Sequence, residues 1–189
     1  NLLGIDAKEY QKGKFFSLRN LEDSKRIRKK ISEIQTITII GAGFIGLEIA
    51  TTALQLNKDV TIIENSENVM GRSISQDLSK WLINYYTKSG IKFIFNKSFK
   101  SFKSDENSII NVVLSDDTKI KSGMVLISAG SQPNDSLFKN IKVNEFNKIK
   151  VNSFLETNID DIYAIGDCCF FDYYSKEVRL ESIQNATDQ

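Results

Sequence analysis

Residues 36–64 read TITIIGAGFIGLEIATTALQLNKDVTIIE, and this stretch decides the fold of the chain. A β-branched apolar run over residues 37–40 leads directly into the glycine-rich turn GAGFIG, residues 41–46. The pattern after the turn has helical spacing, and a second apolar strand pattern follows over residues 59–63. This order of strand, G-x-G-x-x-G turn, helix and strand is typical of the βαβ unit that binds dinucleotides.

Each glycine of the turn has a separate structural role in such a unit. Gly41 permits the tight bend, Gly43 lets the backbone approach a pyrophosphate, and Gly46 lets the helix pack closely against its strand. The N–H groups at the start of the helix, which include those of Phe44 and Ile45, have no partner within the helix. We therefore expect these residues to bind the phosphates of a dinucleotide at the positive end of the helix dipole.

Glu64 ends the second strand of the unit, at about the position where the fingerprint places an acidic residue. A carboxylate there can accept hydrogen bonds from both hydroxyls of the adenosine ribose, and it repels a 2′-phosphate. The sequence therefore predicts NAD(H) rather than NADP(H) as the dinucleotide. Two alternatives stay open: Glu64 can be an ordinary solvated acid, and Arg72, a few residues downstream, can contact a phosphate.

The composition is that of an ordinary soluble globular protein, since 41% of the 189 residues are hydrophobic and 26% are charged. The net charge of +1 gives no reason to expect nucleic acid binding, and the basic cluster at residues 25–30 is typical of an exposed helix face. No apolar run approaches the ~20 residues that cross a bilayer, and the N-terminus lacks the pattern of a secretion signal. We therefore expect no membrane association and a cytoplasmic location.

The two cysteines, Cys168 and Cys169, are adjacent, so their side chains diverge too far for an unstrained disulfide. They form neither a C-x-x-C redox motif nor a metal-ligand pattern. The chain has no histidine, which excludes Ser-His-Asp and Cys-His hydrolase sites and histidine-ligated metal sites within it. We expect no metal site.

The other elements follow from periodicity and turn residues. A helix is expected from Asn20, where Asp23 completes a capping-box-like arrangement, and another from residue 75 to a stop at Gly90. Alternating patches between residues 98 and 121 predict a small antiparallel meander, where a plain doubly wound sheet would have another helix. Further strands are expected over residues 15–16, 91–95, 124–128, 148–151 and 162–165, and a last helix near residue 182. The predicted fold class is α/β, with a three-layer Rossmann-like domain.

Five blocks of the sequence carry a family resemblance: FSLRNLEDS (16–24), the fingerprint (41–48), GSQPN (130–134), AIGDC (164–168) and RLESIQNA (179–186). With these blocks in this order, the chain resembles FAD-dependent, NADH-utilising ferredoxin reductases of the putidaredoxin and rubredoxin reductase type, within the pyridine nucleotide-disulfide oxidoreductase group. The resemblance covers nearly the whole chain. It implies that residues 1–18 are the tail of a first FAD-domain segment, residues 19–128 an NAD-binding domain, and residues 129–189 the returning part of a second, FAD-binding domain.

The resemblance also implies roles for single residues. Asp167 would hydrogen-bond the ribityl chain near the flavin pyrophosphate, which agrees with a strand that ends in Gly-Asp at a sheet edge. Arg19, Gly130 and Ile183 would contact the flavin cofactor. Glu48 would lie near the nicotinamide and the flavin, where a buried carboxylate could orient the carboxamide rather than transfer a proton. The alternatives are a turn residue for Asp167, surface charges for Arg19 and Glu48, and a core residue for Ile183.

By resemblance, the activity is that of an enzyme in which NADH passes a hydride to FAD, and FAD passes electrons singly to a small iron–sulfur protein such as a ferredoxin or rubredoxin. The implied cofactors are FAD and NAD, and relatives include monomers and homodimers. The family's N-terminal FAD fingerprint and C-terminal domain are absent from this sequence, as is the C-x-x-x-x-C pair of the disulfide reductases. We therefore expect a fragment that binds NAD, binds FAD weakly or not at all, and turns over little. The alternatives are a truncated NAD(H)-binding module without activity and a related reductase with nitrite, a disulfide or a quinone as acceptor.

Overall fold

The computed structural model has two compact units, residues 1–130 and residues 131–189. The residues that it describes are 3, 5–6, 8, 10, 12–71, 73–104, 110–130, 141 and 149–189. Each unit has a sheet and a buried core of its own. The division into segments 1–18, 19–128 and 129–189 stays a prediction.

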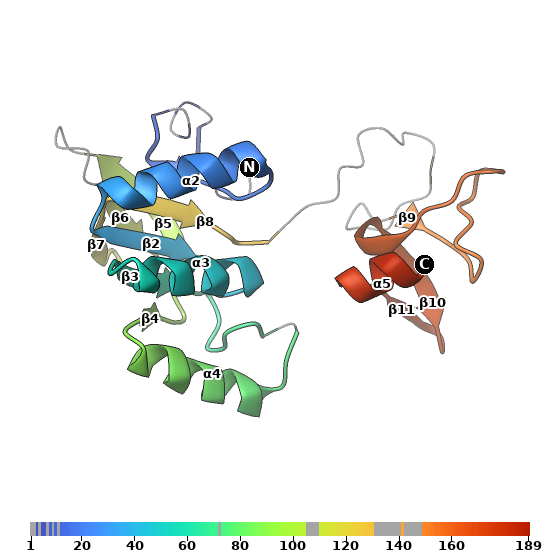
Figure 1. The fold of residues 1–189 in the computed structure, drawn as a ribbon. Helices are drawn as coiled ribbons and strands as arrows, with labels where there is room; N and C mark the ends of the chain where they lie inside the picture. The colour runs from blue at the N-terminus through green and yellow to red at the C-terminus, as the bar shows by residue number, and fades with distance from the viewer. Residues whose placement is uncertain are drawn as a thin grey trace. The chain divides into compact units, whose positions relative to one another are not determined.

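A five-stranded parallel sheet forms the centre of the first unit (Figure 1). In spatial order its strands are β1 (Phe15–Phe16), β8 (Met124–Ile127), β2 (Thr36–Ile40), β3 (Asp59–Ile63) and β4 (Lys92–Ile94). Strand β2 lies between β8 and β3, so that Ile39 is aligned with both Leu126 and Ile62. The expected βαβ unit therefore lies in the middle of the sheet, and the carboxyl ends of β8, β2 and β3 meet at one edge.

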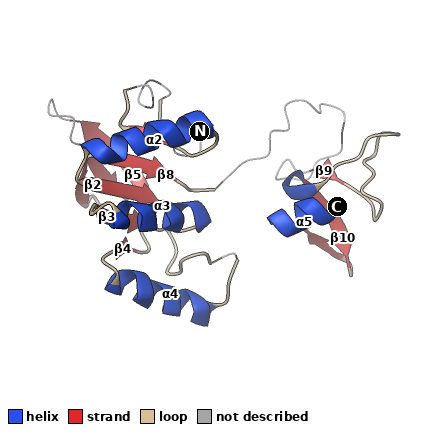
Figure 2. Ribbon diagram, viewed as in Figure 1, coloured by secondary structure: helices blue, strands red, loops and turns tan. Residues whose placement is uncertain are grey.

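Three helices cover one face of this sheet: α2 (Leu21–Glu33), α3 (Phe44–Gln55) and α4 (Gln76–Lys88) (Figure 2). Ile27 and Ile31 of α2 and Leu47 of α3 join one buried cluster with the strands, and α4 adds partly buried side chains to it. The expected cap of α2 is present, since the side chain of Asn20 accepts a hydrogen bond from the N–H of Asp23 at 2.9 Å. None of the helices in the described ranges combines the length and the apolar character needed to cross a membrane.

An antiparallel meander covers the opposite face of the sheet. It consists of β5 (Phe99–Ser104), β6 (Ile110–Leu114) and β7 (Lys119–Ser122), in that spatial order. Successive side chains of a strand point to opposite faces. Accordingly, Phe16 and Ile62 lie in the cluster under the helices, while Phe15 and Ile63 lie in the cluster under the meander. The predicted three-layer α/β fold with its meander is confirmed.

The second unit has a small mixed sheet. Strand β10 (Cys169–Tyr173) pairs in parallel with β9 (Ile149–Lys150) and antiparallel with β11 (Lys176–Val178). A single 3₁₀ turn, η1 (Gly166–Cys168), precedes β10, and the short helix α5 (Ile183–Asp188) packs against this turn. The last helix therefore begins where the sequence predicts it, after Ser182, whose side chain accepts a hydrogen bond from the N–H of Asn185 at 3.1 Å.

The prediction of a strand over residues 162–165 is wrong. Tyr163 makes an isolated bridge with Glu156, and no longer ladder is formed by these four residues. Ala164 is the one buried residue among them, so they lack the alternating buried face of a strand. Asp167 consequently lies in η1, before β10, and not at the end of a strand.

Two further elements differ from the expectation. Strand β4 is shorter than residues 91–95, because it is the edge strand of the sheet and its Phe93 is only partly buried. The hairpin of β10 and β11 was not predicted at all. Its turn residues Tyr174 and Ser175 have φ values of +46° and +59°, without the glycine or asparagine that usually indicates such a turn in a sequence.

Candidate functional site

The glycine turn lies at the carboxyl end of β2 and is fixed by both neighbouring strands. Gly41 has a φ of +102°, and a Cβ at this position would lie 2.6 Å from the carbonyl oxygen of Ser128. The N–H of Gly41 donates a hydrogen bond of 2.8 Å to the carbonyl of Ile63, which ties the turn to β3. Any other residue would be strained in conformation and would collide with the end of β8.

Helix α3 passes closest to the turn at Gly46. A Cβ on Gly46 would overlap the carbonyl oxygen of Gly41 and would lie 2.8 Å from the Oγ of Ser128. The Ser128 hydroxyl itself is 2.9 Å from the Gly41 carbonyl oxygen and 3.1 Å from that of Ile40. The single proton of the Ser128 hydroxyl is therefore shared between the last carbonyl of β2 and the first carbonyl of the turn.

The first turn of α3 offers N–H groups that the helix does not use. The first helical hydrogen bond runs from the N–H of Leu47 to the carbonyl of Gly43 at 3.0 Å, so the N–H groups of Gly43, Phe44 and Ile45 precede it. Within the described part of the chain no side chain caps this helix at Gly43. Together with the helix dipole, these groups can bind an anion such as a pyrophosphate.

Space for such an anion is present above Gly43. No described atom lies within 4 Å of the place where a Cβ of Gly43 would be, in contrast to the crowded Gly41 and Gly46. The side chains of Phe44 and Ile45 are exposed to 58% and 41% and leave the start of the helix accessible. The geometry of the turn therefore fits the pyrophosphate of a dinucleotide.

Glu64 lies beside the turn, at the carboxyl end of β3, and its carboxylate is half-buried. Its Oε2 accepts a hydrogen bond of 2.8 Å from the N–H of Ala42, inside the glycine turn. Its Oε1 accepts hydrogen bonds from the N–H of Ser66 at 3.0 Å and from the Ser66 hydroxyl at 3.1 Å. The carboxylate is therefore fixed next to the N–H groups that α3 does not use, where the ribose of a bound adenosine would lie.

Glu48 lies on the second turn of α3 and is exposed in the first unit. The family resemblance implies a buried carboxylate, and the first unit by itself does not bury it. The main-chain carbonyl of Glu48 accepts a hydrogen bond of 3.0 Å from the hydroxyl of Thr52, an ordinary contact within the helix. Its suggested role beside the nicotinamide stays a prediction.

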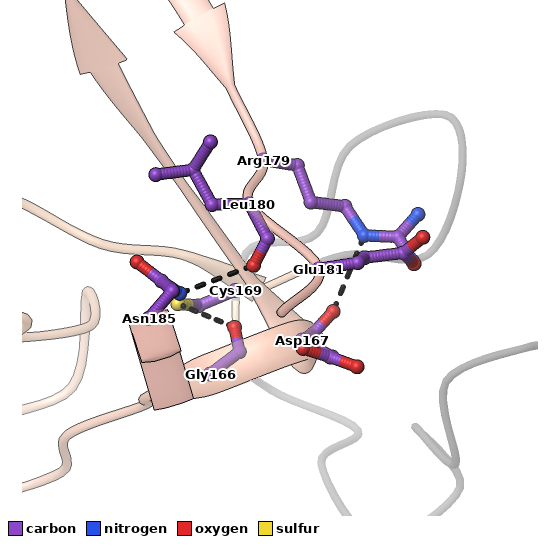
Figure 3. Close-up of polar contacts among 7 residues, drawn as sticks. All are labelled: Gly166, Asp167, Cys169, Arg179, Leu180, Glu181 and Asn185. Carbon is purple, nitrogen blue, oxygen red and sulfur yellow. Dashed lines mark hydrogen bonds and ion pairs between the residues drawn. The ribbon is translucent and has the colours of Figure 1, made fainter. Parts of the chain in front are cut away.

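In the second unit, Asp167 belongs to a small cluster of polar contacts between η1 and the segment that leads into α5 (Figure 3). Asp167 is exposed, and its main-chain carbonyl accepts a hydrogen bond of 3.3 Å from the Nε of Arg179, which also pairs with Glu181. Ile183, the first residue of α5, is 89% exposed. A carboxylate and an apolar side chain are thus both open to a ligand, and their assignment to a flavin stays a prediction.

Gly166 joins η1 to α5 in this cluster. It has a φ of +73°, and its N–H donates a hydrogen bond of 2.7 Å to the side-chain oxygen of Gln189. A Cβ on Gly166 would lie 3.3 Å from the Cβ of Ala186 on α5. A glycine next to Asp167 therefore lets α5 lie close against the turn.

Two more of the expected flavin contacts lie in the first unit. Arg19 is exposed, and its N–H donates a hydrogen bond of 3.0 Å to the carboxylate of Asp23, which fixes the start of α2. Gly130 follows β8 with a φ of +99°. Arg72 and the rest of the GSQPN block, residues 131–134, lie outside the described residues, so the alternative contact of Arg72 with a phosphate stays open.

The two cysteines are adjacent free thiols of the second unit. Cys168 and Cys169 are both unbridged, and burial raises the pKa of the Cys169 thiol, which keeps it protonated at neutral pH. In the ranges that the structure describes, no three cysteine, aspartate or glutamate side chains gather into a metal site.

Sequence reasoning missed two residues at the site, Ser66 and Ser128. Both are small polar residues just beyond the end of a parallel strand, which is where ligands of such sheets bind. Their position at or just after the end of a predicted strand is the feature of the sequence that could have indicated them. It gives no indication of which carbonyl or carboxylate each hydroxyl reaches, because this depends on strands that are far apart in the sequence.

The sequence matches, over residues 1–189, the family described as Pyridine nucleotide-disulphide oxidoreductase. Among curated proteins, the rubredoxin-NAD(+) reductase of Pseudomonas putida is 30% identical to it over 91% of this chain and 45% of the relative. Putidaredoxin reductase CamA of Pseudomonas putida is also 30% identical, over 93% of this chain and 42% of the relative. The chain thus spans less than half the length of these relatives.

Solved structures agree with this match. The chain superposes on a ferredoxin reductase of the CYP199A2 system from Rhodopseudomonas palustris with a TM-score of 0.84 and 30% identity. That superposition covers 92% of this chain and 43% of the other.

Proposed function

The chain belongs to the pyridine nucleotide-disulphide oxidoreductase family, and on that premise we propose that it forms the NADH-binding part of a flavoprotein reductase. The whole enzyme would take a hydride from NADH onto FAD and pass single electrons to a small iron–sulfur protein such as a ferredoxin or rubredoxin. Relatives named as rubredoxin, putidaredoxin and ferredoxin reductases support this acceptor class. The observation that carries the proposal is the exposed start of α3, which no described side chain caps, beside the fixed carboxylate of Glu64.

The residues of the first unit bind the adenosine half of NADH. The N–H groups of Gly43, Phe44 and Ile45 hold the pyrophosphate, while Gly41 and Gly46 allow the backbone path that places those groups together. The carboxylate of Glu64 accepts a hydrogen bond from the ribose and disfavours the extra phosphate of NADPH. The coenzyme is therefore NAD(H).

Glu48 orients the nicotinamide end. From the second turn of the same helix, its exposed carboxylate can accept a hydrogen bond from the carboxamide and select the ring face that is presented. Its function is to orient the ring, and no proton transfer is assigned to it. The burial expected around this carboxylate would come from parts of the protein outside the first unit.

The flavin-side residues are Arg19, Gly130, Asp167 and Ile183. The exposed Asp167 carboxylate can accept hydrogen bonds from the hydroxyls of a ribityl chain, and the exposed Ile183 offers an apolar contact and its main chain to the flavin ring. When bound, FAD supplies the step from two-electron to one-electron chemistry. We infer a cytoplasmic location, because the reaction draws on the cellular pool of NADH, and a homodimer stays a prediction.

A second candidate function is an NAD(H)-binding module without activity of its own. It is favoured by the division of the proposed cofactor residues over two units. A related reductase with nitrite, a disulfide or a quinone as acceptor is the remaining alternative. The two classes differ in one measurable property, since an inactive module transfers no electrons from NADH even when FAD is supplied.

Titration calorimetry of the 189-residue chain with NADH and NADPH tests the proposal. We expect the chain to bind NADH more tightly than NADPH. Glu64→Ala should lower the affinity for NADH about tenfold, which corresponds to the loss of one hydrogen bond to a charged group, about 1.5 kcal/mol. Glu67→Ala, which removes a neighbouring exposed acid, is the matched control and should bind like the parent. Absence of NADH binding by the parent chain would overturn the assignment of the coenzyme.

The same samples separate the enzyme from the inactive module. With FAD added, an enzyme fragment reduces ferricyanide at the expense of NADH faster than free FAD does, and a module does not. Sequence on either side of this chain would then show whether an acceptor-docking domain or a cysteine pair belongs to the whole protein.

A further inference from the structure

The carboxylate of Glu64 has fewer free acceptor positions than the sequence argument assumed. A carboxylate offers about four lone-pair positions in total. The N–H of Ala42 uses one on Oε2, and the N–H of Ser66 uses one on Oε1. The single proton of the Ser66 hydroxyl is shared between Oε1, at 3.1 Å, and the carbonyl oxygen of Asn68, at 3.0 Å. One position, on Oε2 and next to the glycine turn, is left for a ligand. Glu64 in this arrangement accepts one ribose hydroxyl and not both.

Ser66 holds the carboxylate from a rigid position. Its N–H and its hydroxyl both reach Oε1 of Glu64, while its carbonyl accepts a hydrogen bond of 3.2 Å from the N–H of Asn96, beyond the end of β4. Its hydroxyl is also 3.0 Å from the carbonyl oxygen of Asn68. The segment after β3 is therefore tied to the segment after β4, and Ser66 is placed by the main chain.

Fixing a carboxylate matters for the choice between NADH and NADPH. A glutamate side chain has three rotatable bonds, and a free one can turn away from a negative ligand at little cost. A carboxylate held at both oxygens keeps its charge where the 2′-phosphate of NADPH would be placed. It also needs no further ordering when the ribose of NADH binds, so less conformational entropy is lost.

We propose that Ser66 is a positioning residue for coenzyme selection, which holds the Glu64 carboxylate against the glycine turn so that it accepts one ribose hydroxyl and rejects a 2′-phosphate. This inference rests on the proposed binding of NADH at the turn. Ser66 acts through Glu64, and its effect therefore disappears when the carboxylate is removed.

The test is a set of NADH and NADPH titrations of the full chain carrying Ser66→Ala, Ser66→Thr, Glu64→Ala and the Glu64→Ala/Ser66→Ala pair. Ser66→Ala should lower the affinity for NADH about three- to tenfold. The loss is limited because the N–H of residue 66 keeps its hydrogen bond to Oε1 and only the hydroxyl contact is removed. NADPH affinity should stay equal or rise, so the preference for NADH narrows. Ser66→Thr, which keeps a hydroxyl, should restore the parent values, and Ser66→Ala should change nothing in the Glu64→Ala background.

Ser32→Ala is the matched control, since Ser32 is also an exposed serine whose hydroxyl bonds a main-chain carbonyl, at the end of α2. Thermal midpoints of the Ser66→Ala and Ser66→Thr variants should agree with the parent, because Ser66 is exposed. Parent-like binding by Ser66→Ala, a failure of Ser66→Thr to rescue, or an equal loss in the Glu64→Ala background would each overturn the inference while leaving NADH binding intact. A parent chain that binds no NADH overturns the proposed function instead, so the two failures are distinguishable.

Discussion

Gly46 is the residue at which the glycine turn tolerates the least change. A Cβ there would overlap the Gly41 carbonyl oxygen and press on the Ser128 hydroxyl. The first group is packed main chain, and the second is already hydrogen-bonded. Gly43, two residues after Gly41, has free space around it instead. Glycines in one motif therefore have different physical requirements, packing at Gly46 and room for a ligand at Gly43.

We expect Gly46→Ala to lower the free energy of unfolding by about 1–3 kcal/mol, the usual cost of overpacking a buried site. Urea unfolding of the chain would measure it. Gly43→Ala is the matched control and should cost less, at most about 1 kcal/mol, because no described atom lies within 4 Å of the added Cβ and alanine only replaces glycine as the N-cap. Equal losses for the two variants would contradict the packing argument.

At the residue scale, the sequence predicted the parts of the site that are contiguous along the chain. The order of strand, glycines, helix and acid is local, and it placed Gly41, Gly43 and Glu64 around one turn as the structure has them. Ser66 and Ser128 were missed, because their partners lie on other strands. The expectation that Glu64 accepts both ribose hydroxyls also assumed a free carboxylate, and its hydrogen bonds to Ala42 and Ser66 appear only in three dimensions.

Helix α3 differs from α2 and α4 at its N-cap, the residue just before the helix. Asn20 and Ser75 cap α2 and α4 with their side chains, while the start of α3 at Gly43 has no side-chain cap among the described residues. A capped helix satisfies its own N–H groups, and an uncapped one keeps them for a ligand. Judged from sequence alone, α3 has the weakest N-terminal cap of the three helices, and its N-terminus is the one that can bind an anion.

Gly43→Asp tests this contrast. An aspartate at the N-cap fits the extended backbone of Gly43 and should bond the free N–H groups itself, so we expect unfolding free energy to stay equal or to rise by a few tenths of a kcal/mol. The added carboxylate takes the place of the pyrophosphate and repels it, so NADH binding should fall below detection. Calorimetry and urea unfolding on one sample measure both effects, and a stable variant that still binds NADH would contradict the assignment of the phosphate site.

Elements were predictable where one periodicity runs for several turns or where a cap stands before it. The five-stranded sheet, the helices and the meander of the first unit follow from such patterns. In the second unit the signals are short. The turn at Tyr174 and Ser175 adopts positive φ without the residues that favour it. Residues 162–165 include two isoleucines, which favour strands, but only Ala164 among them is buried. Local propensity decides little in such segments.

At the scale of the whole molecule, the proposed ligands divide between the two units. The glycine turn, Glu64 and Ser66 lie in residues 1–130, and Asp167 and Ile183 lie in residues 131–189. Glu48 is the residue at which this matters most, because the buried carboxylate expected from the sequence is exposed on the first unit. The proposed adenosine site therefore lies within the first unit, while the proposed flavin-side residues lie in both units.

Hydrogen exchange with and without NADH should show this division directly. At a free concentration of 100 times Kd, a ligand stabilises the state that binds it by about 2.7 kcal/mol, which slows amides that exchange by unfolding of the unit about 100-fold. We expect this slowing in β2, α3 and β3, around the turn and Glu64, with β10 and α5 of the second unit exchanging as before. Gly43→Asp should remove the protection, because that variant keeps the fold and loses the ligand. Slowing confined to the second unit would place NADH elsewhere and contradict the site, since none of the groups assigned to its pyrophosphate or ribose lies there.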